Sequence, residues 1–400
     1  MEIKRLLARR TNKLTPTHRA TKSYGEATTH VLRRNENRLP LLETHHPKRP
    51  NCRRRVSITG PSVLVTDRSS PLPYPLTSQE ALLQFSNQLS PAERAEMLDF
   101  PCIYFLGLPE QPVVDLPDGE YPLRIGDHLA YRYEVLSVIG RGSFGQVCKC
   151  LDHKDGQLVA VKVLKNQPRF HKQAVVELRM LTLVQQTPHL VQIQSHFLFR
   201  RHMCIVFDLL SRNLYQLLQR SHFSGLPLKL LRRFAFQILK GLAVLRAKGI
   251  IHCDIKPENI LLVHPKKPQL QIIDLGIACL ESETIYAYIQ SRFYRAPEVI
   301  LGMPYSCSID MWSFGCLLAE LYTGKPLLAG ENEARQLQAI IALKGLPPAA
   351  WMKQGSKACK YFTENGVLLP ELSNFKQSRS LAEHLLGSPS GLIDLVASKV

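Results

Sequence analysis

Apolar and polar residues alternate along the chain from Tyr131, and this two-residue period predicts strands. The alternation runs through Y-R-Y-E-V-L-S-V-I, pauses at a glycine-rich turn and resumes in Q-V-C-K-C-L-D and L-V-A-V-K-V-L. A helical period follows over 173–183, and a long amphipathic helix is predicted over 232–246. A strand-rich part therefore gives way to a helix-rich part near residues 207–213, which indicates an α+β protein.

Two short helices are predicted before the first strand. The run T-S-Q-E-A-L-L-Q-F places its apolar residues on one helical face behind a Ser78 cap. A second helix begins at Ser90, with proline at its first position and a glutamate placed to complete a capping box. Residues 77–130, these helices and a linker, are too few to hold a large core alone. We therefore expect this block to pack on the strands that begin at Tyr131.

Composition indicates a globular protein of the cell interior. Hydrophobic residues make up 45% of the 400 residues and charged residues 21%, which excludes a wholly disordered or collagen-like chain. No apolar run is long enough to span a membrane, and the N-terminus lacks the apolar block of a secretory signal. The ten cysteines include no C-x-x-C pair, which favours a reducing compartment. We expect no membrane association, and a location in the cytoplasm, the nucleus or both.

The net charge of +18 is concentrated near the N-terminus. Residues 1–60 contain 15 Lys or Arg and four Glu, a net of +11, which leaves +7 for the remaining residues. Residues 1–76 have no sustained apolar period, so a basic, solvated, disordered tail is the simplest interpretation. A nuclear address around 48–55 and a phosphate-binding arm are alternatives, and a transit peptide is a weaker one because glutamates interrupt the basic run.

A glycine-rich turn separates the first two predicted strands. G-R-G-S-F-G-Q-V matches G-x-G-x-x-G-x-V, and Gly140, Gly142 and Gly145 let backbone amides approach phosphate oxygens. A dinucleotide fold requires this turn to open a helix, whereas here a strand follows it. Lys162 lies on an apolar strand, where an ammonium needs a partner, and Glu177 on the next helix can supply one. Together they predict a site for nucleotide phosphates.

The segment 250–262, I-I-H-C-D-I-K-P-E-N-I-L-L, carries the strongest chemical signal. Asp254 is placed to accept a proton from a substrate hydroxyl, and Lys256 to steady a γ-phosphate. Asn259, and Asp274 in Q-I-I-D-L-G, offer oxygen ligands for a cation such as Mg²⁺. The set predicts phosphoryl transfer from ATP.

Further motifs complete an ordered set that resembles a eukaryotic protein kinase. A-P-E occupies 296–298, and D-M-W-S-F-G occupies 310–315. The resemblance implies a bilobal fold, with a β-rich N-lobe and hinge over 131–210 and a helical C-lobe over 211–370.

The sequence before A-P-E narrows the family. T-I-Y-A-Y-I-Q-S-R-F-Y-R-A-P-E, with H-C-D in place of H-R-D, resembles the dual-specificity tyrosine-phosphorylation-regulated kinase (DYRK) family. A-Y-R-Y-E-V-L, L-D-H-K and R-F-H-K-Q-A agree with it upstream, and I-D-M-W-S-F-G-C-L-L-A-E-L-Y-T-G-K-P-L downstream. The helical block, with N-Q-L-S-P and Y-F-L-G-L, is similar to the accessory region of the family's class-two branch. The resemblance spans residues 77–350.

The resemblance implies an ATP- and Mg²⁺-dependent kinase that phosphorylates its own Tyr288 with help from the accessory region. Arg292 and Arg295 are the implied partners of that phosphate, and they matter more because Cys253 replaces an arginine. Mature members then phosphorylate Ser and Thr of protein substrates, favouring an upstream Arg and a following Pro. Residues implied around the nucleotide base and hinge are Ile139, Val147, Ala160, Phe207, Asp208, Leu210, Leu261 and Ile273.

Three departures from the family pattern affect this expectation. Leu275 replaces the phenylalanine of D-F-G and Ala287 stands where threonine is common, and we expect neither to affect the chemistry. No W-x-P-x-x-R-like run follows the G-L-P-P segment, and residues 371–400 form an atypical C-terminal tail. We therefore expect an incomplete C-lobe, with Glu298 unpaired and apolar faces exposed on the helix that starts near Asp310.

Three functions are consistent with these patterns. The leading hypothesis is an active protein kinase, since every residue of the chemical set is present. The alternative is a catalytically impaired pseudokinase that acts as a binding scaffold, because the C-lobe departs from the family. Nucleic-acid binding by the basic tail ranks last, because no nucleic-acid-binding motif accompanies the charge. The oligomeric state remains open.

Overall fold

A computed structural model confirms the division into a strand-rich and a helix-rich part. Residues 74–400 form one compact unit, and the predicted basic tail lies almost wholly outside the described residues. None of the described helices is long and apolar enough to cross a membrane. The structure describes residues 74–108, 114–284, 287–373, 380–385 and 390–400.

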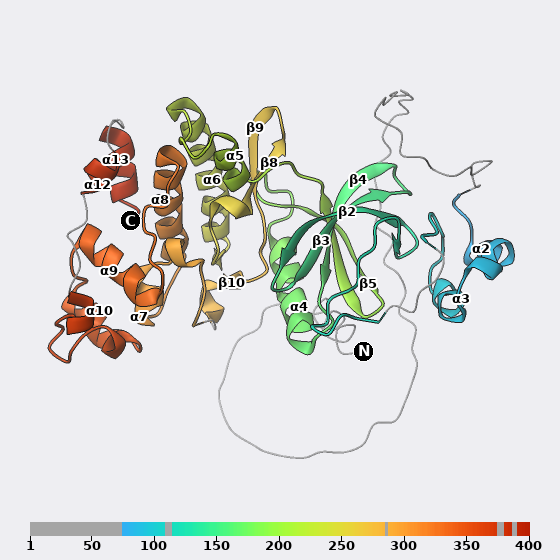
Figure 1. The fold of residues 1–400 in the computed structure, drawn as a ribbon, viewed down its shortest axis with the longest axis horizontal. Coiled ribbons are helices and arrows are strands. Elements are labelled where there is room, and N and C mark those ends of the chain that lie inside the picture. The colour runs from blue at the N-terminus through green and yellow to red at the C-terminus, as the bar shows by residue number, and fades with distance from the viewer. Residues whose placement is uncertain (1–73, 109–113, 285–286, 374–379, 386–389) are drawn as a thin grey trace, which may run out of the picture. The chain divides into compact units, whose positions relative to one another are not determined.

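The N-lobe is built on an antiparallel sheet of six strands in the order β1-β2-β3-β4-β6-β5 (Figure 1). The three strands predicted from alternation are β2, β3 and β4, and most of their apolar side chains are buried or partly buried, with Ile139 and Leu158 as exposed exceptions. The strands are β1 (His128–Leu129), β2 (Tyr133–Gly142), β3 (Gly145–Asp152), β4 (Gln157–Leu164), β5 (Ile193–Phe199) and β6 (His202–Asp208).

One long helix accompanies this sheet. Helix α4 (Pro168–Leu183) begins five residues before the predicted start at residue 173. Its first residue is a proline, which is well tolerated at the first position of a helix. Leu178 and Leu181 of α4 are buried in the same apolar cluster as Leu164 of β4. The helix is thereby fixed beside the strand that carries Lys162.

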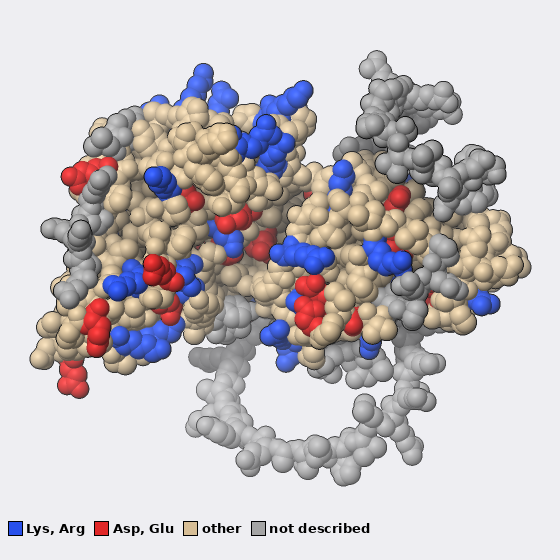
Figure 2. Space-filling view, in the orientation of Figure 1, with Lys and Arg blue, Asp and Glu red and all other residues tan. Residues whose placement is uncertain are grey.

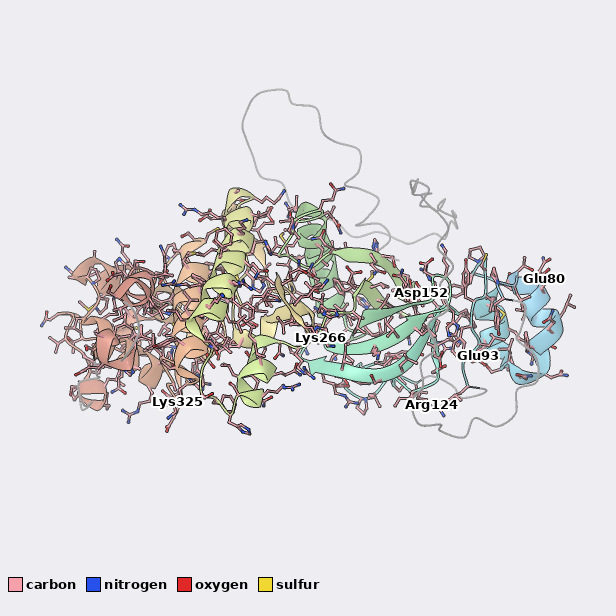
Figure 3. All side chains as sticks on the ribbon, turned by 90° about the horizontal axis from the view of Figure 1, so that it is seen from above. Glu80, Glu93, Arg124, Asp152, Lys266 and Lys325 are labelled. Carbon is pink, nitrogen blue, oxygen red and sulfur yellow. The ribbon has the colours of Figure 1, made fainter. Side chains whose placement is uncertain are left out.

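The two predicted N-terminal helices are present, with one difference at a cap. Helix α2 (Ser78–Phe85) is capped by Thr77 rather than Ser78, because Thr77 Oγ1 accepts the Glu80 N–H and the Glu80 carboxylate accepts the Thr77 N–H. Helix α3 (Pro91–Met97) has the predicted capping box at Ser90. Figure 3 labels Glu80 and Glu93, the two reciprocal partners.

These helices pack on the N-lobe sheet, as expected. Met97, Ile103 and Tyr131 are fully buried in one shared cluster. Glu96 of α3 accepts hydrogen bonds from Tyr131 Oη at 2.9 Å and from Arg200 Nη2 at 3.1 Å. The accessory block is therefore held by both apolar contacts and an ion pair.

The C-lobe is mostly helical, with two short antiparallel pairs of strands. The predicted long helix is α6 (Leu228–Ala247), and the apolar runs on either side of Asp254 form strands. The paired strands are β7 (Ile250–Ile251) with β10 (Cys279–Leu280), and β8 (Ile260–His264) with β9 (Lys267–Ile272). The other helices are α5 (Leu214–Arg220), α7 (Pro297–Leu301), α8 (Ser308–Thr323), α9 (Glu333–Lys344), α10 (Ala349–Gln354), α11 (Pro370–Ser373), α12 (Leu381–His384) and α13 (Ser390–Ala397).

The expectation that α8 exposes apolar faces is wrong. Phe314, Leu317 and Leu318 are fully buried, and α13 packs beside α8 (Figure 1). The fit is close, since a Cβ added at Gly315 would lie 2.5 Å from Val400 Cγ2. Residues 390–400 therefore cover the helix with a segment that the family motifs do not include.

Candidate functional site

The structure brings Lys162 together with Glu177 and Asp274, three residues predicted from separate motifs. Lys162 Nζ donates to Glu177 Oε1 at 2.6 Å and to Asp274 Oδ1 at 3.0 Å. The three side chains come from β4, from α4 and from the segment after β9. The pair of contacts therefore joins the N-lobe to the C-lobe at one point.

Burial and charge act in opposite directions on this cluster. Burial disfavours the ammonium of Lys162, but the carboxylates of Asp274 and Glu177 outweigh it and raise its pKa. The positive charge of Lys162 lowers the pKa of Asp274. Burial raises the pKa of Glu177 despite its contact with Lys162. Lys162 therefore stays charged and can bind a phosphate.

Asp254, Lys256 and Asn259 form a second group on the loop between β7 and β8. Lys256 Nζ lies 2.6 Å from Asp254 Oδ2. The amide nitrogen of Asn259 donates to the backbone oxygen of Asp254 at 2.9 Å and to Oδ2 at 3.0 Å. These contacts fix the orientation of the Asp254 carboxylate.

Ser291 is a site residue that sequence reasoning missed. Its hydroxyl donates to Asp254 Oδ1 at 2.8 Å, and its backbone N–H lies 3.1 Å from the same oxygen. Lys256 Nζ donates to the Ser291 hydroxyl at 3.0 Å. A lone serine before R-F-Y-R-A-P-E carries no chemical signal in one sequence, so only the fold reveals this contact.

Asp310 fixes the backbone of the loop that carries Asp254, a contact that the D-M-W-S-F-G motif did not predict. Its carboxylate accepts the backbone N–H groups of His252 at 2.7 Å and Cys253 at 3.0 Å. Cys253 and Asp274 both adopt left-handed backbone conformations, with φ of 67° and 64°, which side chains other than glycine adopt infrequently. The sequence signal for this role was an acidic residue near the start of a largely apolar helix.

The donor set fits a magnesium ion. The Ile273 N–H donates to the backbone oxygen of Asn259 at 2.9 Å, so Asn259 lies beside the segment that carries the next residue, Asp274. Because the nitrogen of the Asn259 side chain is turned to Asp254, its amide oxygen remains for a cation. A carboxylate and a neutral amide oxygen are ligands that Mg²⁺ accepts.

The predicted nucleotide-pocket residues lie on adjoining strands at the junction of the lobes. Val147 pairs across the ladder with Lys162, and Ala160 with Phe207. The chain leaves β6 at Asp208 and enters α5 at Leu214, so Asp208 and Leu210 lie on the connection between the lobes. Ile139 lies on β2, half exposed, and Leu261 and Ile273 lie on the β8–β9 hairpin and its exit.

The three glycines of the turn differ in their surroundings. Space is open around Gly142, as a phosphate-binding turn requires. Gly145 instead permits close packing of two strands, because a Cβ there would lie 2.1 Å from the backbone oxygen of Val163. Gly140 has ordinary contacts, because a Cβ added there would lie 3.7 Å from Val147 Cβ.

Tyr288 and Arg295 are in contact, while the first tyrosine of the Y-A-Y motif lies outside the described residues. Tyr288 is 65% exposed, and the Arg295 guanidinium lies 4.1 Å from its ring centre. A hydrogen bond and the charge of Arg295 lower the pKa of Tyr288, with a smaller contribution from Arg292. Arg295 is anchored by Glu333 at 2.8 Å, so its position does not depend on the tyrosine.

Comparison with known proteins agrees with this geometry. The protein kinase domain family matches residues 133–377, more than half of the chain. Dual specificity tyrosine-phosphorylation-regulated kinase 4 of Homo sapiens is 47% identical over 307 residues, 73% of this chain and 59% of that protein. The chain belongs to the protein kinase family and, within it, to the DYRK family. The predicted α+β kinase fold is thus confirmed.

Other DYRK relatives give the same picture. Kinase 3 of Mus musculus is 46% identical over 79% of this chain and 56% of its own length. Kinase mbk-2 of Caenorhabditis briggsae is 42% identical over 82% of this chain and 42% of its own length. The chain thus spans 59% or less of the length of these three relatives.

Proposed function

We propose that this chain transfers the γ-phosphate of ATP to Ser and Thr residues of proteins and phosphorylates its own Tyr288. The observation that carries the proposal is the contact of Lys162 with both Glu177 and Asp274. Phosphoryl transfer depends mainly on positioning and on charge stabilisation, and a charged lysine joining the two lobes contributes to both.

Each side chain has a separate task in this proposal. Lys162 binds nucleotide phosphates, and Glu177 keeps it in place. Asp254 orients the substrate hydroxyl and accepts its proton, while Lys256 contributes positive charge beside the transferred group. A Mg²⁺ ion held by Asn259 and Asp274 would supply charge that offsets the phosphates.

Transfer to a serine peptide tests this function directly. The full chain with MgATP is expected to phosphorylate a peptide that has an upstream Arg and a following Pro, and to act more slowly when either is replaced by Ala. The Asp254→Asn variant should lower kcat about 10³-fold. Asp155→Asn, a change at an exposed carboxylate, is the matched control. No transfer above the Asp254→Asn background, from folded protein, would contradict the proposal.

The scaffold alternative has one supporting observation. Among the described residues, no Lys or Arg forms an ion pair with Glu298, whose carboxylate meets Ser308 Oγ at 3.3 Å. Burial raises the pKa of Glu298. If wild-type protein binds nucleotide without any transfer, this unpaired carboxylate is the first place to seek the defect.

The autophosphorylation proposal rests on the exposure of Tyr288 and on the arginine beneath it. A phosphate there would carry about two negative charges at neutral pH, and Arg295 and Arg292 lie near enough to affect the tyrosine's pKa. Mass spectrometry of protein made in bacteria is expected to find phosphotyrosine at 288 in wild type and none in Asp254→Asn. Equal phosphorylation of both would indicate a different enzyme.

A further inference from the structure

A groove opens on the C-lobe away from the catalytic residues. It has a volume of about 490 Å³ and lies between α5, the first turns of α6 and the β8–β9 hairpin. Leu217, Leu230, Phe234 and Leu262 supply its apolar lining. Phe234 and Leu262 are buried, whereas Leu217 and Leu230 remain partly exposed. The groove therefore offers apolar surface that an extended chain can reach.

The edge of the groove is basic on both sides. Lys229 and Arg233 project from α6, and Lys266 and Lys267 from the turn of the hairpin, and all four are exposed. The α5–α6 side of the groove holds no opposite charge, since residues 209–253 contain eight Lys or Arg and no Asp or Glu. Figure 2 shows blue side chains without red ones over the upper ends of α6 and the hairpin, and Figure 3 labels Lys266.

These features favour one class of occupant. An apolar floor with a basic rim complements a peptide that has aliphatic side chains and carboxylates. Single-stranded nucleic acid is disfavoured because base stacking needs exposed aromatic rings, and the one aromatic side chain that lines the groove, Phe234, is 1% exposed. We propose that this groove binds an acidic, leucine-containing peptide segment of a partner or substrate protein.

The groove shares a strand with the candidate active site. Neighbouring residues of a strand point to opposite faces, so Leu262 lines the groove while Leu261 faces the predicted nucleotide pocket. A bound segment would therefore be tethered close to the catalytic loop, which raises the local concentration of its protein. The inference does not depend on catalysis, because peptide binding is measured without ATP.

Fluorescence anisotropy of a labelled peptide, with a run of glutamates followed by alternating leucines, tests the proposal on the full chain. Saturable binding is expected, and Lys266→Glu combined with Lys267→Glu should raise Kd about tenfold through lost attraction and added repulsion. Leu230→Ala should raise Kd about fivefold by removing apolar contact.

The controls separate this groove from general basic charge. Arg246→Glu alters an exposed residue on the same helix, about 20 Å from Arg233, beyond the screening length of charge at 0.1 M salt, and should leave Kd within about twofold. The proposal is overturned if the peptide does not saturate, if lysines in place of its glutamates bind equally well, or if Arg246→Glu weakens binding as much as the paired lysine change. Tighter binding of a single-stranded RNA through the same lysines would also overturn it.

Discussion

Lys162 keeps its charge in a buried place because two carboxylates share it. Replacing Glu177 by Gln leaves Asp274 as the single charged partner, so the ammonium is held less firmly at the proposed phosphate site. We expect Glu177→Gln to lower kcat/KM about 10²-fold in peptide phosphorylation. Glu134→Gln, which alters a hydrogen bond between Glu134 and His153 away from this cluster, should leave kcat/KM nearly unchanged. Equal losses in the two variants would contradict the assignment.

We expect Glu320 to make the free energy of unfolding depend on pH, independently of catalysis. Burial raises its pKa to about 7, although Tyr294 donates a hydrogen bond to it. The folded protein therefore retains a proton that the unfolded chain releases near pH 4.5, and the free energy of unfolding should fall by about 3 kcal/mol between pH 4.5 and 7. Urea unfolding of Glu320→Gln is expected to lack this part of the decrease. Exposed Glu331→Gln should retain it, and identical slopes for both variants would contradict the shift.

Helix α3 is the element on which docking of the accessory block depends. Met97 is fully buried against the N-lobe, so Met97→Ala should lower the free energy of unfolding by about 3 kcal/mol. Leu83 of α2 is 86% exposed, so Leu83→Ala should change the free energy of unfolding by less than about 0.5 kcal/mol. Denaturant titration of both variants measures the difference. A small effect of Met97→Ala would mean that the accessory block does not add to the stability of the N-lobe.

The sequence predicted the elements that have a regular hydrophobic period or a known motif. It did not predict contacts between residues that are far apart in the chain. Alternation located β2, β3 and β4, and the H-C-D segment located the catalytic loop, because both signals are local. The Asp310 contacts and the Ser291 hydroxyl depend on loops meeting across the fold. The Thr77 cap differed by one residue, since Thr and Ser are both good caps and stand side by side.

In the whole molecule, the packing of α13 on α8 is the feature that the sequence motifs predicted wrongly, because they indicated an exposed apolar face on α8. Residues 390–400 lie beyond the matched kinase domain, yet Leu392 and Val396 are buried in the main apolar cluster. The sequence of α13 is short and apolar and does not indicate which element it packs on. Only the fold shows that it covers α8. The role of the basic tail and the cellular location stay predictions.

A charged side chain introduced between α13 and α8 tests whether α13 stabilises the C-lobe. Val396 is fully buried, so Val396→Asp should lower the free energy of unfolding by about 3 kcal/mol or more, whereas Ala397→Asp, on the exposed side of the same helix, should change it little. Thermal unfolding monitored by circular dichroism compares them. Equal melting temperatures would show that α13 does not stabilise the C-lobe.

In the proposed mechanism, Lys162, Asp274 and Asn259 bind the nucleotide, whereas Asp254 acts in the transfer step. The most direct measurement compares nucleotide affinity by calorimetry with the transfer rate, in Asp254→Asn and in Asp274→Asn. We expect Asp254→Asn to bind MgATP within about twofold of wild type and to transfer phosphate about 10³-fold more slowly. Asp274→Asn should lose both magnesium-dependent binding and transfer. Normal transfer by Asp254→Asn, or loss of its nucleotide binding, would contradict this division of roles.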